Sequence, residues 1–139
     1  MHEGVMYYYQ KAIKNGFAHS GKLENETVFL KTFGEVSPVC GNPDDFIFFY
    51  IMIDQEQITQ TRYQCIVDPV TNAVIEMICS LIEGKTISEV ASLNPQSLFK
   101  IIGENDSLVE EKATHLLKLI NDSIILWHLK IKEKHCEHQ

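Results

Sequence analysis

The amino-acid sequence predicts an α+β domain in which a three-stranded antiparallel sheet packs against helices. Between residues 28 and 67, three segments rich in β-branched and aromatic residues are separated by polar turns, as in strands linked by hairpins. After residue 73 the apolar positions recur at helical spacing, and strands and helices do not alternate as they do in a parallel sheet. A chain of 139 residues is long enough to bury a core, so we expect one domain over residues 1–139.

The first half of the chain is predicted to form a short helix and then the sheet. A helix is expected over residues 5–15, ended by Gly16, and a polar loop leads from it to the strand VFLKTFGEV. The run FIFFYIMID, residues 46–54, is almost wholly apolar and is predicted to be a strand buried on both faces or nearly so. Four polar residues join it to ITQTRYQCIV, which completes an antiparallel hairpin. The alternation in this last strand places one set of side chains on a common face: Thr59, Thr61, Tyr63, Cys65 and Val67.

The second half is predicted to be helical. Gly84 closes the first of four helices, and Thr86 is the expected N-cap of the second. Asn94 caps the third helix, with Pro95 at its first helical position. The last helix has an apolar stripe that alternates four-residue and three-residue steps, which predicts one face packed on the core. The expected ranges are 73–84, 87–93, 94–103 and about 107–132.

Composition excludes several classes of function. The net charge is −7 and no block of Lys or Arg opposes it, so we expect no nucleic-acid partner. The longest apolar run, FIFFYIMI, is far shorter than the ~20 residues of a membrane-spanning helix, and we expect no membrane association. The beginning of the chain lacks a secretory signature and its four cysteines form no dense framework. We therefore expect reduced thiols in the cytoplasm.

Cys40 is the most unusual of the cysteines. It lies in the turn PVCGNPDD, where Pro, Gly, Asn and Asp are expected to give it no apolar shell. Backbone N–H groups in such a turn lower the pKa of a thiol, which favours a reactive or metal-binding thiolate. Cys79 lies on the apolar side of its helix and is expected to be a small buried hydrophobic residue. Core packing is also favoured for Cys65, although it lies near the end of its strand and close to Asp68.

Other polar residues have simpler interpretations when they are taken singly. His115, one residue before Leu116 of the apolar stripe, is typical of a histidine at the edge of a core. Asp68 precedes Pro69 and is expected to be a turn or capping residue. The ends MHEG and KHCEHQ contain histidines, but frayed termini offer a metal poor geometry. No catalytic motif is present, and we expect that the protein is not an enzyme.

The order of these elements, with several short motifs, resembles the U-type iron–sulfur cluster assembly scaffolds, namely IscU and the NifU N-terminal domain. GEVSPVCGN is similar to the family's GEVGNPVCGD, which places Cys40 on the first cluster cysteine. ITQTRYQ resembles a family strand with Arg62 in register, and LIEGKTISEV resembles V-K-G-K-[ST]-L-E-E-A. EEKATHLLKLINDSI resembles the start of the family's last helix. The resemblance covers about residues 6–127 and leaves 128–139 as a helix end and tail.

The resemblance also implies an altered set of metal ligands. In register with the second cluster cysteine is Asp68, and in register with the third is His115, so that Cys40, Asp68 and His115 form the implied site. A thiolate, a carboxylate and an imidazole suit Zn²⁺ or Fe²⁺ better than an all-sulfur cluster. The implied cargo is therefore iron, a [2Fe–2S] cluster or zinc. Further ligands or modulators are expected among neighbouring residues: Asn42, Asp44, Asp45 and Cys65.

Two alternatives remain open from the sequence. The chain is either a degenerate relative that keeps the fold as an interaction or regulatory module without metal, or a sulfur acceptor similar to SufE proteins that uses Cys40. The resemblance implies a cysteine desulfurase and other iron–sulfur assembly proteins as partners. A dedicated chaperone is a doubtful partner, because NDSLVEEK stands where the family has its Pro-Pro-Val-Lys segment.

Overall fold

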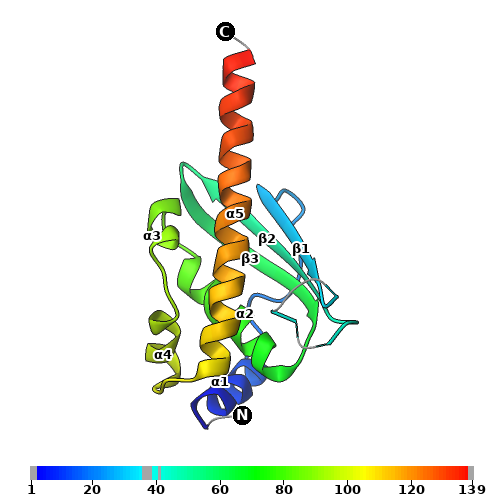
Figure 1. Ribbon diagram of the computed structural model, residues 1–139, viewed down its shortest axis with the longest axis vertical. Helices are drawn as coiled ribbons and strands as arrows, with labels where there is room; N and C mark the ends of the chain where they lie inside the picture. The colour runs from blue at the N-terminus through cyan, green and yellow to red at the C-terminus, as the bar shows by residue number, and fades with distance from the viewer. Residues whose placement is uncertain (1–2, 36–38, 41, 138–139) are drawn as a thin grey trace.

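The computed structural model describes residues 3–35, 39–40 and 42–137, and from residue 134 onward it describes only the backbone. Three strands form one antiparallel sheet in the order β1-β2-β3, and helices pack against it, which confirms the predicted α+β class (Figure 1). The elements follow one another as α1 (Glu3–Lys14), β1 (Val28–Phe33), β2 (Phe46–Asp54), β3 (Gln57–Ile66), α2 (Pro69–Ile82), α3 (Ile87–Ala91), α4 (Gln96–Ile102) and α5 (Ser107–Glu137).

One face of β2 is fully buried and the other is only partly buried, so the prediction that β2 is buried on both faces, or nearly so, holds fully for the inner face alone. Ile47, Phe49 and Ile51 are completely buried, whereas the alternate side chains Phe48 and Tyr50 remain partly exposed. The cause is the placement of the helices, because α2 contacts β3 and α5 contacts β1 while α2 and α5 also pack on each other. The aromatic residues that made β2 look fully buried instead form the outer face of the sheet.

The first side chains of β3 lie on the opposite faces of the sheet from those predicted. The register with β2 shifts between Met52 and Ile53, which is an irregularity of the bulge type. Ile58 therefore points into the core and Thr59 is exposed, contrary to the expected alternation. Beyond the shift the alternation holds, and Thr61 is buried as expected.

The helices begin and end close to the predicted positions. Helix α2 begins earlier than expected, at Pro69, because Asp68 caps it. Thr86 forms the expected capping box of α3. Helix α4 begins at Gln96 with Pro95 as its N-cap, so the predicted cap at Asn94 was one residue too early. The Asn94 side chain still accepts a hydrogen bond from the Gln96 amide at 3.0 Å. Helix α5 is longer than predicted and projects beyond the rest of the domain (Figure 1). Within the described part of the chain, no helix combines the length and apolar character needed to span a membrane.

Candidate functional site

The loop that connects β1 to β2 carries Cys40 and folds back on itself. Gly34 donates its backbone N–H to the carbonyl of Asp45 at 2.8 Å, and Asp45 donates to the carbonyl of Asn42 at 3.1 Å. The Asn42 amide in turn donates to the Asp45 carboxylate at 3.0 Å. A side chain at position 34 would be impossible without movement, since a Cβ there would lie 1.8 Å from the Asn42 oxygen. The closed loop brings Asp45 beside Cys40.

Cys40 is buried, with 9% of its surface exposed, and it belongs to the hydrophobic core. The prediction that it has no apolar shell was therefore wrong, because the loop turns its thiol inward. Burial raises the pKa of this thiol, the negative charge of Asp45 raises it further, and Lys112 opposes the shift. The direction is opposite to the lowering expected from the turn. Cys40 is thus a protected, protonated thiol in this conformation.

Cys65 lies near the end of β3, opposite Ile47 of β2, and is half-buried. Burial raises the pKa of Cys65 to about 11, and Cys40 and Asp45 add to the shift through their negative charge. Asp45 is itself buried. Cys40 and Asp45 lie in the loop between β1 and β2, and Cys65 lies near the end of β3. The two loop residues are close enough to Cys65 for their charges to raise its pKa.

Asp68 caps helix α2, which confirms its predicted capping role. Its two carboxylate oxygens accept from the Thr71 backbone N–H at 2.9 Å and from the Thr71 hydroxyl at 2.8 Å. Burial alone would raise the pKa of Asp68, but the Thr71 hydrogen bonds and the charge of Lys112 lower it below its ordinary value. The carboxylate is therefore ionised and is already held by groups of the protein.

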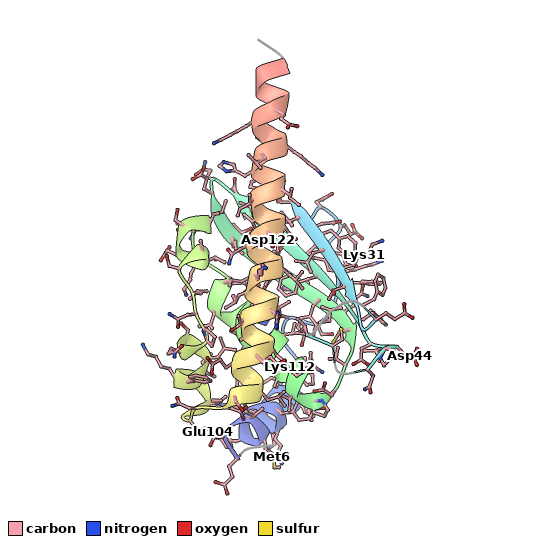
Figure 2. The ribbon with its side chains drawn as sticks, viewed as in Figure 1. Met6, Lys31, Asp44, Glu104, Lys112 and Asp122 are labelled. Carbon is pink, nitrogen blue, oxygen red and sulfur yellow. The ribbon has the colours of Figure 1, made fainter. Side chains whose placement is uncertain are left out.

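Lys112 was missed by the sequence analysis, although it is central to this region. Its side chain is buried, and the ammonium group donates to the Val39 carbonyl at 2.8 Å and lies 3.7 Å from the Asp68 carboxylate. It reaches the region from α5 (Figure 2). Its position directly before Ala113 of the apolar stripe was the available signal, because a lysine beside such a stripe needs a partner when it is buried. We call the following group the ligand pole: Cys40, Asp45, Cys65, Asp68 and Lys112.

The structure does not bring every predicted ligand into the ligand pole. His115 is half-buried on α5, one turn beyond Lys112 on the same side of the helix. Asn42 and Asp44 are exposed, and Asp44 lies at the outer tip of the loop (Figure 2). Over the described residues, no group of three His, Cys, Asp or Glu side chains is placed to hold a metal ion. The tail KHCEHQ and the first two residues of MHEG lie outside the described side chains.

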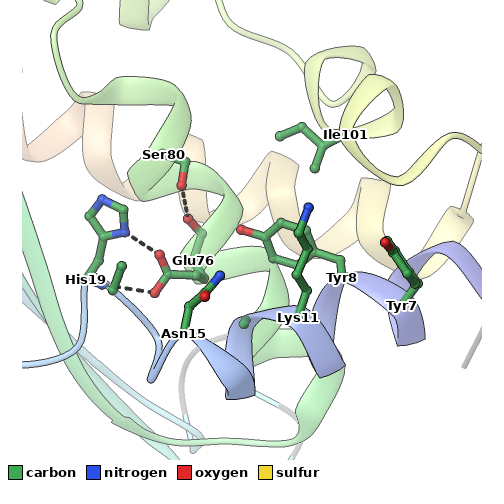
Figure 3. Close-up of a pocket in the computed structure, with 10 residues that line it drawn as sticks. Tyr7, Tyr8, Lys11, Asn15, His19, Glu76, Ser80 and Ile101 are labelled. Atoms are coloured by element: carbon green, nitrogen blue, oxygen red, sulfur yellow. Dashed lines mark hydrogen bonds and ion pairs between the residues drawn. The ribbon is translucent and has the colours of Figure 1, made fainter.

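A second polar cluster lies away from the ligand pole and was not predicted. His19 stands between the carboxylates of Glu76 in α2 and of Glu83, the C-cap of that helix. Its Nδ1 contacts Glu76 (Figure 3), and its Nε2 lies 3.1 Å from Glu83. The Tyr63 hydroxyl lies 3.1 Å from the Glu76 carboxylate, and the Thr61 amide donates to Glu83 at 2.8 Å. A glutamate in the otherwise apolar AVIEMICSLI helix was the available signal.

This second cluster ties the loop after α1 to the sheet and to α2. Both nitrogens of His19 face carboxylates, so both contacts are hydrogen bonds when the ring carries both protons. The imidazole occupies the space between the carboxylates, which excludes a metal held jointly by them. A cavity of about 290 Å³ adjoins His19 and Glu76, with Tyr8 and Lys11 of α1 on its opposite wall (Figure 3). The cluster therefore has a structural role in joining three elements.

Comparison with solved structures supports the fold over nearly the whole chain. An N-terminal NifU-like protein from Brucella abortus superposes with a TM-score of 0.62 at 10% identity, covering 93% of this chain and 94% of that one. A putative iron–sulfur cluster assembly scaffold protein for the SUF system from Fervidobacterium islandicum gives a TM-score of 0.53 at 18% identity, covering 91% and 85%. No curated protein matches the chain.

The family comparison agrees with the motifs and with the fold. The family described as the NifU-like N-terminal domain matches residues 3–133, nearly the whole length of the chain. This confirms the resemblance found from PVCGN, LIEGKTISEV and the last helix. The chain belongs to the NifU-like N-terminal domain family.

Proposed function

We propose that this protein is an iron–sulfur cluster assembly protein of the scaffold type, which binds iron, a [2Fe–2S] cluster or zinc at the ligand pole. Membership of the NifU-like family supports this proposal. The observation that carries it is that Asp45 and Asp68 lie close enough to Cys40, and Cys40 and Asp45 close enough to Cys65, for their charges to raise the pKa of the two thiols, which burial raises most. Thiolate sulfur together with carboxylate oxygen is a donor set that Fe²⁺ and Zn²⁺ accept.

Metal binding at this pole requires a rearrangement of its polar contacts. The Cys40 thiol must lose its proton, since the thiolate is the ligand, and its raised pKa makes that loss costly in the metal-free state. The Asp68 carboxylate must give up its contact with Lys112 or its hydrogen bond from Thr71 in order to bind the metal. His115, one helical turn from Lys112, is the proposed third ligand in the rearranged site. We propose that a cysteine desulfurase and iron–sulfur assembly proteins are the partners, and that the protein has no catalytic turnover of its own.

Anaerobic reconstitution with ferrous iron and sulfide tests the proposal. The wild-type protein is expected to retain iron after desalting, and Cys40→Ser is expected to lose most of it. Cys79→Ala is the matched control, because Cys79 is completely buried in α2 and is no part of the ligand pole. Far-ultraviolet circular dichroism of each variant shows whether the fold is kept. Iron content that is equal in wild type and Cys40→Ser would overturn the proposal.

Lys112 supports the alternative of a module that works without metal. Its buried ammonium balances the charge of the Asp68 carboxylate and donates a hydrogen bond to the Val39 carbonyl, so these two groups need no added cation. A wild-type protein that binds neither iron nor zinc would favour this alternative. The sulfur-acceptor alternative requires an accessible, ionised thiol, and the burial of Cys40 with its raised pKa argues against it.

A further inference from the structure

Strand β1 forms an edge of the sheet, and in the part of the chain that the structure describes no further strand pairs with its outer side. In an antiparallel pair of strands, alternate residues direct their backbone N–H and C=O groups toward the neighbouring strand. Gly34 donates to Asp45 opposite it, so the alternate residues Phe29, Lys31 and Phe33 direct these groups away from β2, to the open edge. Among the described residues, no hydrogen bond engages these outward groups. Such a row of free donors and acceptors is a template for another strand.

The outer face of the sheet beside this edge is aromatic. Phe29 and Phe33 are each 44% exposed, and their side chains stand on the same face as the rings of β2. The ring centroids of Phe29 and Tyr50 are 5.0 Å apart, and those of Phe46 and Phe48 are 4.8 Å apart. Monomeric proteins usually expose apolar side chains singly, whereas here five aromatic rings in mutual contact form one patch on the outer face of the sheet.

The inner side of the same edge has a groove lined by both apolar and polar side chains. A groove of about 310 Å³ lies between the start of β1 and the part of α5 that begins to leave the domain. Val28 and Phe29 line it from the strand, and Leu126 and Trp127 line it from the helix. Leu126 is 59% exposed. An extended chain added to β1 would thus meet aromatic side chains on the outer face. On the inner face it would meet Leu126 and Trp127 beside the polar side chains of Thr27 and Ser123.

Charge indicates the kind of partner that fits this edge. Lys130 lines the groove and Lys31 stands in the middle of the edge strand, and none of the described residues that line the groove carries a carboxylate. The protein as a whole carries a net charge of −7. A lysine on an edge strand discourages pairing with an identical strand, because two copies would bring like charges together. These charges favour a different chain that contributes carboxylates.

We propose that the open edge of β1 binds an extended segment of a partner protein, which adds to the sheet as a fourth strand. Its apolar side chains pack alternately on Phe29 and Phe33 and in the groove against Leu126 and Trp127. Flanking carboxylates of the segment pair with Lys31 and Lys130. This site is separate from the ligand pole and does not depend on metal binding.

A synthetic peptide tests the proposal directly, since Trp127 is the single tryptophan of the chain and lines the groove. The probe has a central run of alternating valine and phenylalanine flanked by aspartates. It is expected to shift the Trp127 emission and to protect the amides of Phe29, Lys31 and Phe33 from hydrogen exchange. A peptide with lysine in place of aspartate, and one with alternate backbone amides N-methylated, are each expected to bind at least about tenfold more weakly.

Two variants locate the site. Leu126→Ser is expected to weaken binding of the aspartate peptide about tenfold, because it removes apolar surface from the groove. Leu108→Ser, an exposed leucine at the other end of α5, is the control and is expected to bind unchanged. Lys130→Glu is expected to weaken binding of the aspartate peptide about two- to fivefold and to strengthen binding of the lysine peptide.

Three results would overturn the proposal. The first is that the aspartate peptide neither shifts the Trp127 emission nor protects the amides of β1. The second is that the aspartate and lysine peptides bind equally well, or that Leu108→Ser weakens binding as much as Leu126→Ser. The third is a dimer in sedimentation experiments whose β1 amides are protected without peptide, which would assign the edge to a second copy of the chain.

Discussion

At the scale of single residues, Lys112 places its ammonium group beside Asp68 and against the carbonyl of Val39, directly before Cys40. In this buried setting a positive charge favours the ionised carboxylate and opposes the arrival of a second cation. The same contact holds the Cys40 loop to α5. Lys112 therefore affects both the stability of the ligand pole and its readiness to accept a metal ion.

Replacing this lysine separates the two effects. Lys112→Met is expected to tighten Zn²⁺ binding about tenfold by removing charge repulsion and the ammonium contact with Asp68. Loss of the hydrogen bond from the charged ammonium to the Val39 carbonyl, which keeps its contact with the Thr71 hydroxyl, is expected to cost about 1.5–3 kcal/mol of stability. Zinc affinity is measured by competition with a chromophoric chelator, and stability by urea unfolding. Lys118→Met removes the same charge from an exposed position of α5 and is expected to change neither quantity. Unchanged or weaker zinc affinity in Lys112→Met would contradict this role.

Glu83 is the second residue with a measurable signature. Burial alone would raise the pKa of Glu83, but hydrogen bonds from Thr61 and the contact with His19 lower it below its ordinary value of 4.5. A depressed pKa in the folded state gives stability that is present above pH 4.5 and is lost as the pH falls through the lowered value. The free energy of unfolding is thus expected to fall with acidification below this pH, and less steeply in Glu83→Gln. Glu133→Gln, exposed on α5, is expected to keep the wild-type slope.

At the scale of elements, the hairpin and the helices were predictable because their signals are local. Alternation in β3, the capping box at Thr86 and the stripe of α5 each depend on a few neighbouring residues. The outer face of β2 was not predictable, since aromatic residues occupy it and only the placement of α2 and α5 shows that it is uncovered. Long-range packing decided that point.

The candidate site was predicted in part for the same reason. The motif PVCGN identified Cys40 as a candidate ligand. Asp68 was identified as a cap because it directly precedes Pro69. The burial of Cys40 was not predictable, because it arises from the way in which the loop closes on Gly34. Lys112 is distant from Asp68 in the sequence, and their pairing requires α5 to lie against the start of α2.

The contacts between elements can be tested at the His19 cluster. His19→Ala removes the imidazole partner of the buried Glu76 carboxylate, and the loss of a hydrogen bond to a charged group costs about 1.5–3 kcal/mol. The free energy of unfolding in urea is expected to fall by this amount. His128→Ala removes the same side chain from an exposed pair with Glu56 at 3.7 Å, and its cost is expected to stay below about 0.5 kcal/mol. Equal losses in the two variants would show that His19 does not join the loop to α2.

At the scale of the whole molecule, the two proposed sites use different parts of one sheet. The ligand pole lies where the loop from β1 to β2 meets the start of α2, and the groove lies at the other end of β1, beside the projecting part of α5 (Figure 1). A partner on the edge strand would therefore leave the Cys40 loop accessible to a donor of iron or sulfur. This division suits a protein that holds a metal and engages other proteins at the same time.

Binding of Co²⁺ under anaerobic conditions tests the central claim most directly, since cobalt replaces zinc or iron and reports each thiolate ligand by a charge-transfer band in the near ultraviolet. The wild-type protein is expected to develop this band to saturation at one metal per chain. Cys40→Ser is expected to lose it, and Cys79→Ala to keep it. A wild-type protein without the band, or a band that survives Cys40→Ser unchanged, would contradict a metal site built on Cys40.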